Sequence, residues 1–121
     1  MEQPLRELVW IRSSKKDLKA FPTRVQDVMG YALFLAQTGS KHRAAKPFKW
    51  VGSGVLEVVD DYDGDTYRAV YAVRFGNVVY VLHAFQKKAK KGIATPKREV
   101  DLIRRRLKDA ADDYEQRKKE G

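Results

Sequence analysis

The chain has 121 residues, 43% of them hydrophobic, and a formal net charge of +9 at pH 7. This length fits one domain spanning residues 1–121, and the apolar fraction is too high for a globally disordered chain. Cysteine is absent and only two histidines are present, which excludes a disulfide framework and a thiol nucleophile and argues against a structural zinc site. Because the sequence contains neither an apolar run of roughly 18 residues nor a signal-peptide pattern, we expect no membrane contact and a soluble, cytoplasmic protein.

The first 54 residues predict a strand, two helices and a loop. Residues 5–11 form a short apolar run typical of a strand, and residues 14–17 have the spacing of a capping box that begins a helix of one or two turns. Pro22 suits the first turn of a second helix, in which apolar residues recur at helical spacing. Gly39 closes that helix, and residues 40–54 are predicted to be a loop.

The middle of the chain predicts three strands. Residues 55–59 and 66–75 are rich in β-branched and aromatic side chains, and the Asp63-Gly64 pair between them is typical of a hairpin turn. Gly76-Asn77 is a second tight turn, after which residues 78–85 form an almost wholly apolar strand. Such a strand is expected at the centre of the sheet, buried on both sides.

A last helix is predicted from Pro96, with Thr95 as its cap and with Val100, Ile103 and Leu107 on one face. The predicted order is therefore β-α-α-β-β-β-α, an α+β fold. We expect the helices to pack on one face of a small, mostly antiparallel sheet. The other face is then free to carry a functional site.

The positive charge is concentrated in two segments that contain no acid. Residues 41–54 contain Lys41, Arg43, Lys46 and Lys49. Residues 87–98 contain Lys87, Lys88, Lys90, Lys91, Lys97 and Arg98. Residues 55–66 have the opposite character, with five acids and no base before Arg68. Such a distribution predicts contact with a polyanion such as nucleic acid, although a merely solvated basic surface has the same pattern.

The four lysines that follow the last strand are the most informative candidates. Lys87, Lys88, Lys90 and Lys91 stand within five residues. Four like charges this close lower one another's pKa values until an anion neutralises them. A phosphate would relieve the repulsion, and a lysine with a lowered pKa could transfer a proton. The alternative is a solvated loop without a partner.

Three residues within the strands have two plausible roles each. Arg68 could clamp a phosphate with its planar guanidinium, or pair with a carboxylate of residues 57–65 on the neighbouring strand. His83 could act as a general acid or base, or pack in the core. Phe85, like Trp50, could stack on a nucleic-acid base or belong to the core.

The sequence contains no metal-binding or phosphate-loop motif. Residues 61–65 resemble a calcium loop only superficially, because the ligand spacing and the closing glutamate are missing, and we interpret them as a turn. Any chemistry is therefore expected to be metal-free and cofactor-free and to use Lys, Arg, His and Tyr. Cleavage of RNA by its own 2′-hydroxyl needs only alignment, charge stabilisation and the transfer of two protons.

Taken together, several of these segments resemble the RelE/ParE toxin superfamily, in particular its HigB-like, phage-derived branch. The resemblance rests on residues 81–88 (VLHAFQKK), Lys90-Lys91, Thr95-Pro96, and the amphipathic helix that follows. Further matches are Lys46-Pro47, Leu56-Glu57 and residues 67–71 (YRAVY). It covers residues 5–108.

This resemblance implies the toxin of a type II toxin–antitoxin system, which cleaves mRNA on the ribosome without a metal. By position, Arg68 would stabilise the charge of the transition state, and Lys87 or Lys88 would be the basic residue after the last strand. His83 is a further catalytic candidate, and the RNA-binding candidates are Lys46, Lys49, Lys90, Lys91 and Phe85. The implied partners are the ribosome, mRNA and a cognate antitoxin, expected to be a helix-turn-helix protein.

Two other functions remain open from the sequence. A toxin of the same fold could inhibit DNA gyrase by binding and leave RNA intact. A non-catalytic RNA-binding module would use the charge for affinity alone, with a steep salt dependence.

Overall fold

The computed structural model describes residues 4–87 and 95–121. Its elements in chain order are β1 (Glu7–Trp10), α1 (Ser14–Lys19), α2 (Thr23–Gln37), β2 (Ala45–Pro47), β3 (Val55–Tyr62), β4 (Asp65–Phe75), β5 (Val78–Lys87) and α3 (Lys97–Glu120). No helix in these two ranges is long and apolar enough to cross a membrane.

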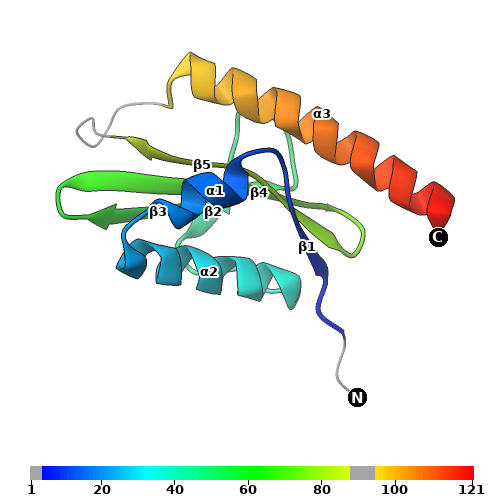
Figure 1. Cartoon of the computed structure of the whole chain (residues 1–121), viewed down its shortest axis with the longest axis horizontal. Helices are drawn as coiled ribbons and strands as arrows, with labels where there is room; N and C mark the ends of the chain where they lie inside the picture. Colours follow the sequence, from blue (N-terminus) through cyan, green and yellow to red (C-terminus); the bar gives the residue numbers. More distant parts are fainter. Residues whose placement is uncertain (1–3, 88–94) are drawn as a thin grey trace.

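The five strands form one mixed sheet in the order β1-β5-β4-β3-β2 (Figure 1). β1 pairs with β5 in parallel, and the other three pairings are antiparallel. The predicted α+β class and mostly antiparallel sheet are therefore confirmed. The almost wholly apolar β5 lies inside the sheet between β1 and β4, as its composition predicted.

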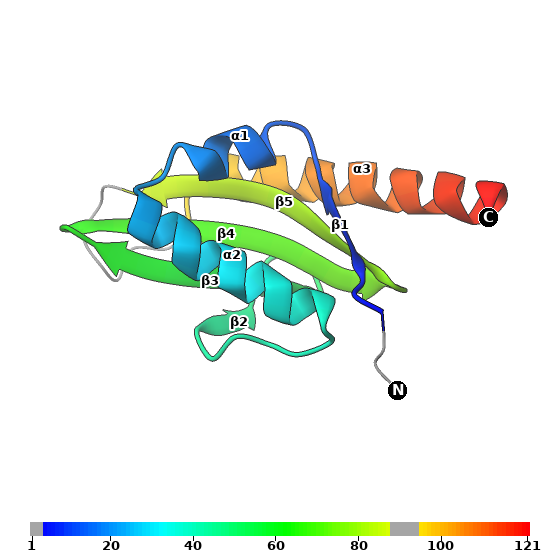
Figure 2. The same ribbon diagram turned by 60° about the horizontal axis from the view of Figure 1, so that its bottom comes forward.

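The helices cover both faces of the sheet, so the prediction that they pack on one face is wrong. α1 and α2 share one core with Tyr71, Val79 and Val81, whereas α3 shares a second core with Val70 and Leu82. Figure 1 shows α2 and α3 on opposite sides of the sheet, and Figure 2 shows α2 running across its face. The reason is that β4 and β5 carry apolar side chains on both of their faces, and each face requires a covering layer.

The segment predicted as a loop between α2 and β3 contains a short strand. In β2 the register places Ala45 opposite Val58, Lys46 opposite Glu57 and Pro47 opposite Leu56. Three residues are too short for a periodic signal, and the proline is tolerated because β2 is the edge strand of the sheet. The observed order is thus β-α-α-β-β-β-β-α. β3 and β5 also extend further than predicted, to Tyr62 and Lys87.

Where the pairing with β1 ends at Val81, the segment after β1, the start of α1 and a side chain of α3 continue to cover the outer edge of β5. The backbone N–H of Ile11 and the hydroxyl of Ser14 both donate to the carbonyl of Val81, at 2.9 and 3.1 Å. The guanidinium of Arg106 donates to the next carbonyl, that of Leu82, at 3.1 Å. Ser14 is therefore not the helix cap that the sequence suggested; the N-cap is Ser13, whose hydroxyl donates to Asp17 at 2.8 Å. These bonds satisfy the carbonyls of an exposed strand edge.

Two buried tyrosines on neighbouring strands allow a matched test of polar satisfaction. The Tyr71 hydroxyl has no hydrogen-bond partner among the described residues, and burial raises the pKa of Tyr71 to about 12. The Tyr80 hydroxyl donates to Asp113 at 2.8 Å. We expect Tyr71→Phe to leave the free energy of unfolding unchanged or to raise it by about 1 kcal/mol, and Tyr80→Phe to lower it by about 1–2 kcal/mol. Urea unfolding of both variants checks this; a clear destabilisation by Tyr71→Phe would contradict it.

Candidate functional site

Four polar side chains form a diagonal row across four adjacent strands. Lys46 of β2 lies opposite Glu57 of β3, and Glu57 lies diagonal to Arg68 of β4, whose direct partner is Val59. Lys87 of β5 lies diagonal to Arg68 in the same way, because it pairs with Thr66. Side chains alternate along each strand, so all four lie on the face that α3 partly covers.

Arg68 and Glu57 form a buried ion pair at the centre of this row. Arg68 NH1 lies 2.7 Å from Glu57 Oε1, and the two side chains are only 15% and 9% exposed. The pairing of Arg68 with a carboxylate of residues 57–65, one of its two predicted roles, is thus observed. The Arg68 Nε is buried and has no hydrogen-bond partner among the described residues. A buried donor without a partner is uncommon and marks a place where an acceptor is missing.

Lys87 ends β5 beside this pair and is 8% exposed. Burial is the main cause that lowers the pKa of Lys87; the charge of Arg68 lowers it further, and Glu57 opposes the shift. The direction of this shift agrees with the sequence-based expectation. Lys88, Lys90 and Lys91 lie outside the described residues.

Lys46 and Lys49 are both exposed. The ammonium of Lys49 lies 5.9 Å from the ring centre of Trp50, which is 43% exposed. Arg104 of α3 donates to the Trp50 carbonyl at 3.2 Å and so ties this loop to α3. Lys46 is connected to the row through its register with Glu57, and Lys49 follows two residues after β2.

Phe85 and His83 lie beneath α3, not on the open surface. Each is 7% exposed, and their rings stack with centroids 4.9 Å apart. Phe85 belongs to the core that includes Ile103 of α3. These positions favour the packing role that the sequence left open for both residues.

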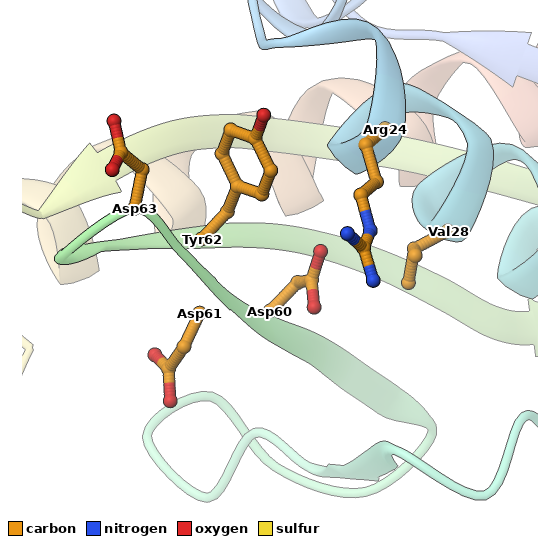
Figure 3. Close-up of a pocket in the computed structure, with 6 residues that line it drawn as sticks. All are labelled: Arg24, Val28, Asp60, Asp61, Tyr62 and Asp63. Carbon is orange, nitrogen blue, oxygen red and sulfur yellow. The ribbon is translucent and has the colours of Figure 1, made fainter.

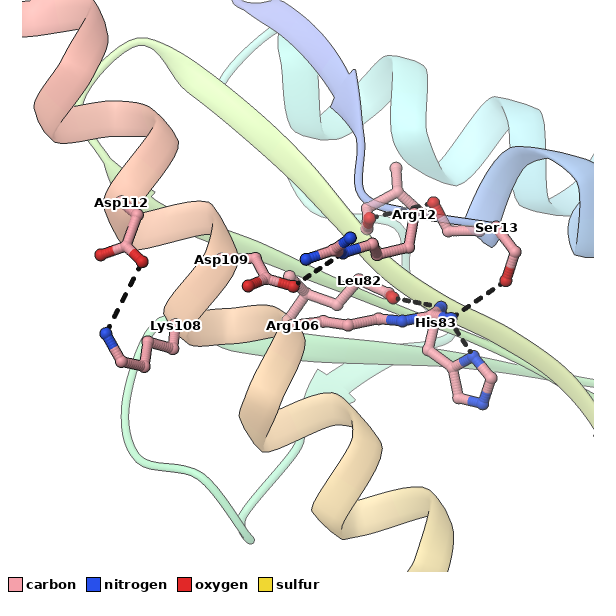
Figure 4. Close-up of polar contacts among 10 residues, drawn as sticks. Arg12, Ser13, Leu82, His83, Arg106, Lys108, Asp109 and Asp112 are labelled. Atoms are coloured by element: carbon pink, nitrogen blue, oxygen red, sulfur yellow. Dashed lines mark hydrogen bonds and ion pairs between the residues drawn. The ribbon is translucent and has the colours of Figure 1, made fainter.

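Both ring nitrogens of His83 are occupied. Nε2 lies 3.1 Å from Glu99 Oε1. Nδ1 lies 3.4 Å from NH1 of Arg106, whose NH2 donates to the hydroxyl of Ser13, the N-cap of α1, at 3.0 Å (Figure 4). Because arginine can only donate, Nδ1 must accept and the proton of the neutral ring sits on Nε2, from which it is donated to Glu99. Burial lowers the pKa of His83, although Glu99 acts in the opposite direction. His83 thus links β5 to α3.

This arrangement predicts a pH-dependent stability. Since the folded protein holds His83 with a lowered pKa, the unfolded chain binds a proton there at a higher pH than the folded chain does. Stability should be complete above the ordinary pKa of about 6.5 and fall as the pH decreases through it. We expect the melting temperature to fall between pH 7.5 and 5.5, and His83→Gln to weaken this fall. His42→Gln is the control; an unchanged slope in His83→Gln would contradict the assignment.

A second basic surface lies at α1, in a segment for which the sequence predicted no site. Arg12, Lys15, Lys16 and Lys19 line an open hollow of about 660 Å³. Arg12 also lines an adjoining hollow of about 320 Å³ together with Arg105 of α3, and it pairs with Asp109 at 3.1 Å (Figure 4). The sequence did not predict this basic surface because the segment contains Asp17 and is therefore not free of acidic residues.

The hairpin between β3 and β4 carries the opposite charge. Figure 3 shows Arg24 of α2 reaching toward Asp60, beside an open hollow of about 570 Å³ that Asp61, Tyr62 and Asp63 also line. The predicted turn is present, with Asp63 and Gly64 at positive φ. In the described parts of the chain, no group of three His, Asp or Glu side chains is placed to hold a metal ion.

The structure thus brings together three of the predicted site residues, Arg68, Lys87 and Lys46. It adds Glu57, which the sequence analysis did not propose for the site although Leu56-Glu57 carried part of the resemblance. A signal was available, since Glu57 is a single acid among apolar residues of a strand, VLEVV. A charge in such a position is stable only if it is paired.

Comparisons with known proteins find similarity over most of the chain. Residues 16–108 match the model of a family described as phage-derived Gp49-like proteins. No curated protein matches the sequence significantly. Among solved structures, the chain is similar to one in the RelBE2 toxin–antitoxin complex from Mycobacterium tuberculosis, with 16% identity and a TM-score of 0.47 over 73% of this chain and 98% of that chain.

Proposed function

Because the chain belongs to the family of phage-derived Gp49-like proteins, we propose that it is a toxin of a toxin–antitoxin system that cleaves mRNA on the ribosome without a metal. The observation that carries this proposal is the row formed by Glu57, Arg68 and Lys87. It places two cations side by side on the sheet, nearly shielded from solvent. In such surroundings a positive charge stabilises a developing phosphorane more strongly than it would in water.

The proposed reaction needs no group that the chain lacks. The 2′-hydroxyl of the RNA gives its proton to solvent water as its oxygen attacks the adjacent phosphorus, the bond from phosphorus to the 5′-oxygen breaks, and a cyclic 2′,3′-phosphate and a 5′-hydroxyl result. Arg68 stabilises the extra negative charge of the phosphorane. Lys87, whose pKa is lowered mainly by burial, binds the phosphate and gives its proton to the departing 5′-oxygen.

The remaining basic surfaces support association with a large RNA. Lys46 and Lys49 are exposed near the row, and the α1 hollow adds four further cations. Such charges bind phosphates without regard to sequence and make the affinity strongly dependent on salt. Lys88, Lys90 and Lys91 belong to the same proposal as RNA contacts. Translating ribosomes would place this activity in the cytoplasm.

A toxin of this kind requires a cognate antitoxin, which we propose to be a helix-turn-helix protein. Neutralisation would follow if the antitoxin covered the row or prevented docking on the ribosome.

The experiment that tests the proposal is induction of the wild type and of Lys87→Ala in a bacterial host, with Lys108→Ala as the control because Lys108 is 78% exposed on α3. Growth is followed, and new 5′ ends are mapped on a reporter mRNA. We expect arrest with cleavage in the wild type and in Lys108→Ala, and loss of both in Lys87→Ala. Arrest with intact mRNA would contradict the ribonuclease and favour a gyrase inhibitor. Soluble protein without arrest would contradict a toxin.

A further inference from the structure

Glu57 is the only acid in the diagonal row, and its presence there requires an explanation. A carboxylate beside a phosphate site repels the substrate, and a carboxylate that is 9% exposed is costly to desolvate. On charge alone, a neutral side chain at this position would bind RNA better. Glu57 must therefore contribute something other than affinity for an anion.

The contact with Arg68 supplies that contribution. An exposed arginine samples many rotamers, and ordering such a side chain costs conformational entropy. The bond of 2.7 Å from NH1 to Glu57 Oε1 is short and shielded from solvent, so it holds the guanidinium in one orientation. The side chain then loses this entropy when the protein folds, so no further loss is needed when the transition state forms.

The bond with Glu57 occupies only part of the guanidinium. Arginine has five N–H groups, and the contact with Glu57 uses NH1. Nε is buried and lacks an acceptor among the described residues. An oriented donor that lacks an acceptor is what a site requires if it is to meet negative charge that appears only during a reaction.

We propose that Glu57 is a positioning residue that fixes the guanidinium of Arg68 so that its remaining N–H groups meet the phosphate of the scissile bond. This inference rests on the proposed function and adds a residue to its site. Glu57 itself does not contact the RNA.

The same carboxylate affects the neighbouring lysine. Burial and Arg68 lower the pKa of Lys87, and Glu57 is the group that counteracts them. Without Glu57, Arg68 and Lys87 would be two adjacent cations with no acid between them, and the pKa of Lys87 would fall further. The alkaline limb of the pH–rate profile should therefore move to lower pH in Glu57→Gln, which a purely structural role would not cause.

The test is a double-mutant cycle in single-turnover cleavage of mRNA on purified ribosomes. We expect Glu57→Ala to lower the maximal single-turnover rate constant by about 10–100-fold, with little change in the concentration that gives half of this rate, since it disturbs a group that acts in the transition state. Glu57→Gln, which keeps an acceptor oxygen, should recover part of the rate. Arg68→Ala with Glu57→Ala should be no slower than Arg68→Ala alone. Asp60→Asn is the control, because Asp60 is on the same strand but faces α2.

Three results would overturn the proposal. Multiplicative losses in the double variant would show that Glu57 acts independently of Arg68. A glutamine variant as slow as Glu57→Ala, with the acidic limb of the pH profile abolished, would make Glu57 a general base. Full activity of Glu57→Ala would remove any role. If Glu57→Ala does not fold, Glu57→Gln and its double variant with Arg68→Ala carry the test.

A second measurement separates this inference from the proposed function. The Nε–H resonance of Arg68 is followed by NMR during titration with inorganic phosphate. We expect one sharp resonance that shifts with phosphate in the wild type, and a broadened resonance with a weaker shift in Glu57→Gln. If the wild type does not cleave mRNA but gives this result, the ribonuclease fails and the positioning role stands. Identical resonances and titrations in both proteins would overturn the positioning role.

Discussion

Arg68→Ala should lower the rate of mRNA cleavage by about 10²–10³-fold, the usual loss when one donor to a developing oxyanion is removed. The guanidinium lies at the centre of the row, between Glu57 and Lys87, and its side chain is 15% exposed. Neither neighbour can replace it, because Glu57 carries the wrong charge and the single ammonium of Lys87 lacks a planar fork. Single-turnover cleavage on ribosomes measures the effect, and growth of the induced host gives a second readout.

The same substitution leaves the Glu57 carboxylate buried without its partner, which costs about 3–5 kcal/mol in typical proteins. Folding must therefore be verified, and Arg68→Lys provides a variant that keeps a positive charge beside Glu57. Its ammonium cannot serve the carboxylate and a phosphate in the same geometry, so we expect an intermediate rate. Arg74→Ala is the matched control, since Arg74 is exposed near the far end of the same strand. A folded Arg68→Ala protein with wild-type cleavage would refute the role of Arg68.

The sheet could be predicted from the sequence because its strands are separated by strong turn signals. Asp63-Gly64 and Gly76-Asn77 define the two hairpins, and their spacing gives β4 and β5 nearly their observed length. β2 could not be predicted, because three residues with a proline carry no periodicity. The apolar side chains on both faces of β5 indicate that each face is covered, and α3 provides the cover of the second face. The prediction of a single helical layer followed the usual arrangement of small α+β folds and did not use this signal.

The alternation of side chains between the two faces of the sheet is interrupted where β4 and β5 are irregular. The register between β4 and β5 shifts between Val70 and Tyr71 and again between Ala72 and Phe75. As a result Phe75, which alternation places with Tyr71, packs instead with the α3 core. β-bulges leave no reliable mark in a single sequence.

The candidate site was only partly predictable for a related reason. Arg68 and Lys87 could be identified by residue type and by their position near strand ends. Their relation to Glu57 depends on the register of three strands, which a sequence alone does not fix. His83 and Phe85 could not be assigned to surface or core until the position of α3 was known.

Ile103→Ala should lower the free energy of unfolding by about 2–5 kcal/mol, the range for removing a large aliphatic side chain from a filled core. Ile103 is 0% exposed and lies in the same core as Phe85, next to the turn of α3 that bears Glu99, the partner of His83. Leu102→Ala is the control, because Leu102 lies on the same helix but is only partly buried, and we expect it to cost about 1 kcal/mol or less. Urea unfolding measures both. Hydrogen exchange should show lost protection across residues 96–110 in Ile103→Ala, because α3 is held to the sheet by this contact. If the two variants were equally stable, α3 would not be anchored through Ile103, and the cover over His83 and Phe85 would have to come from elsewhere.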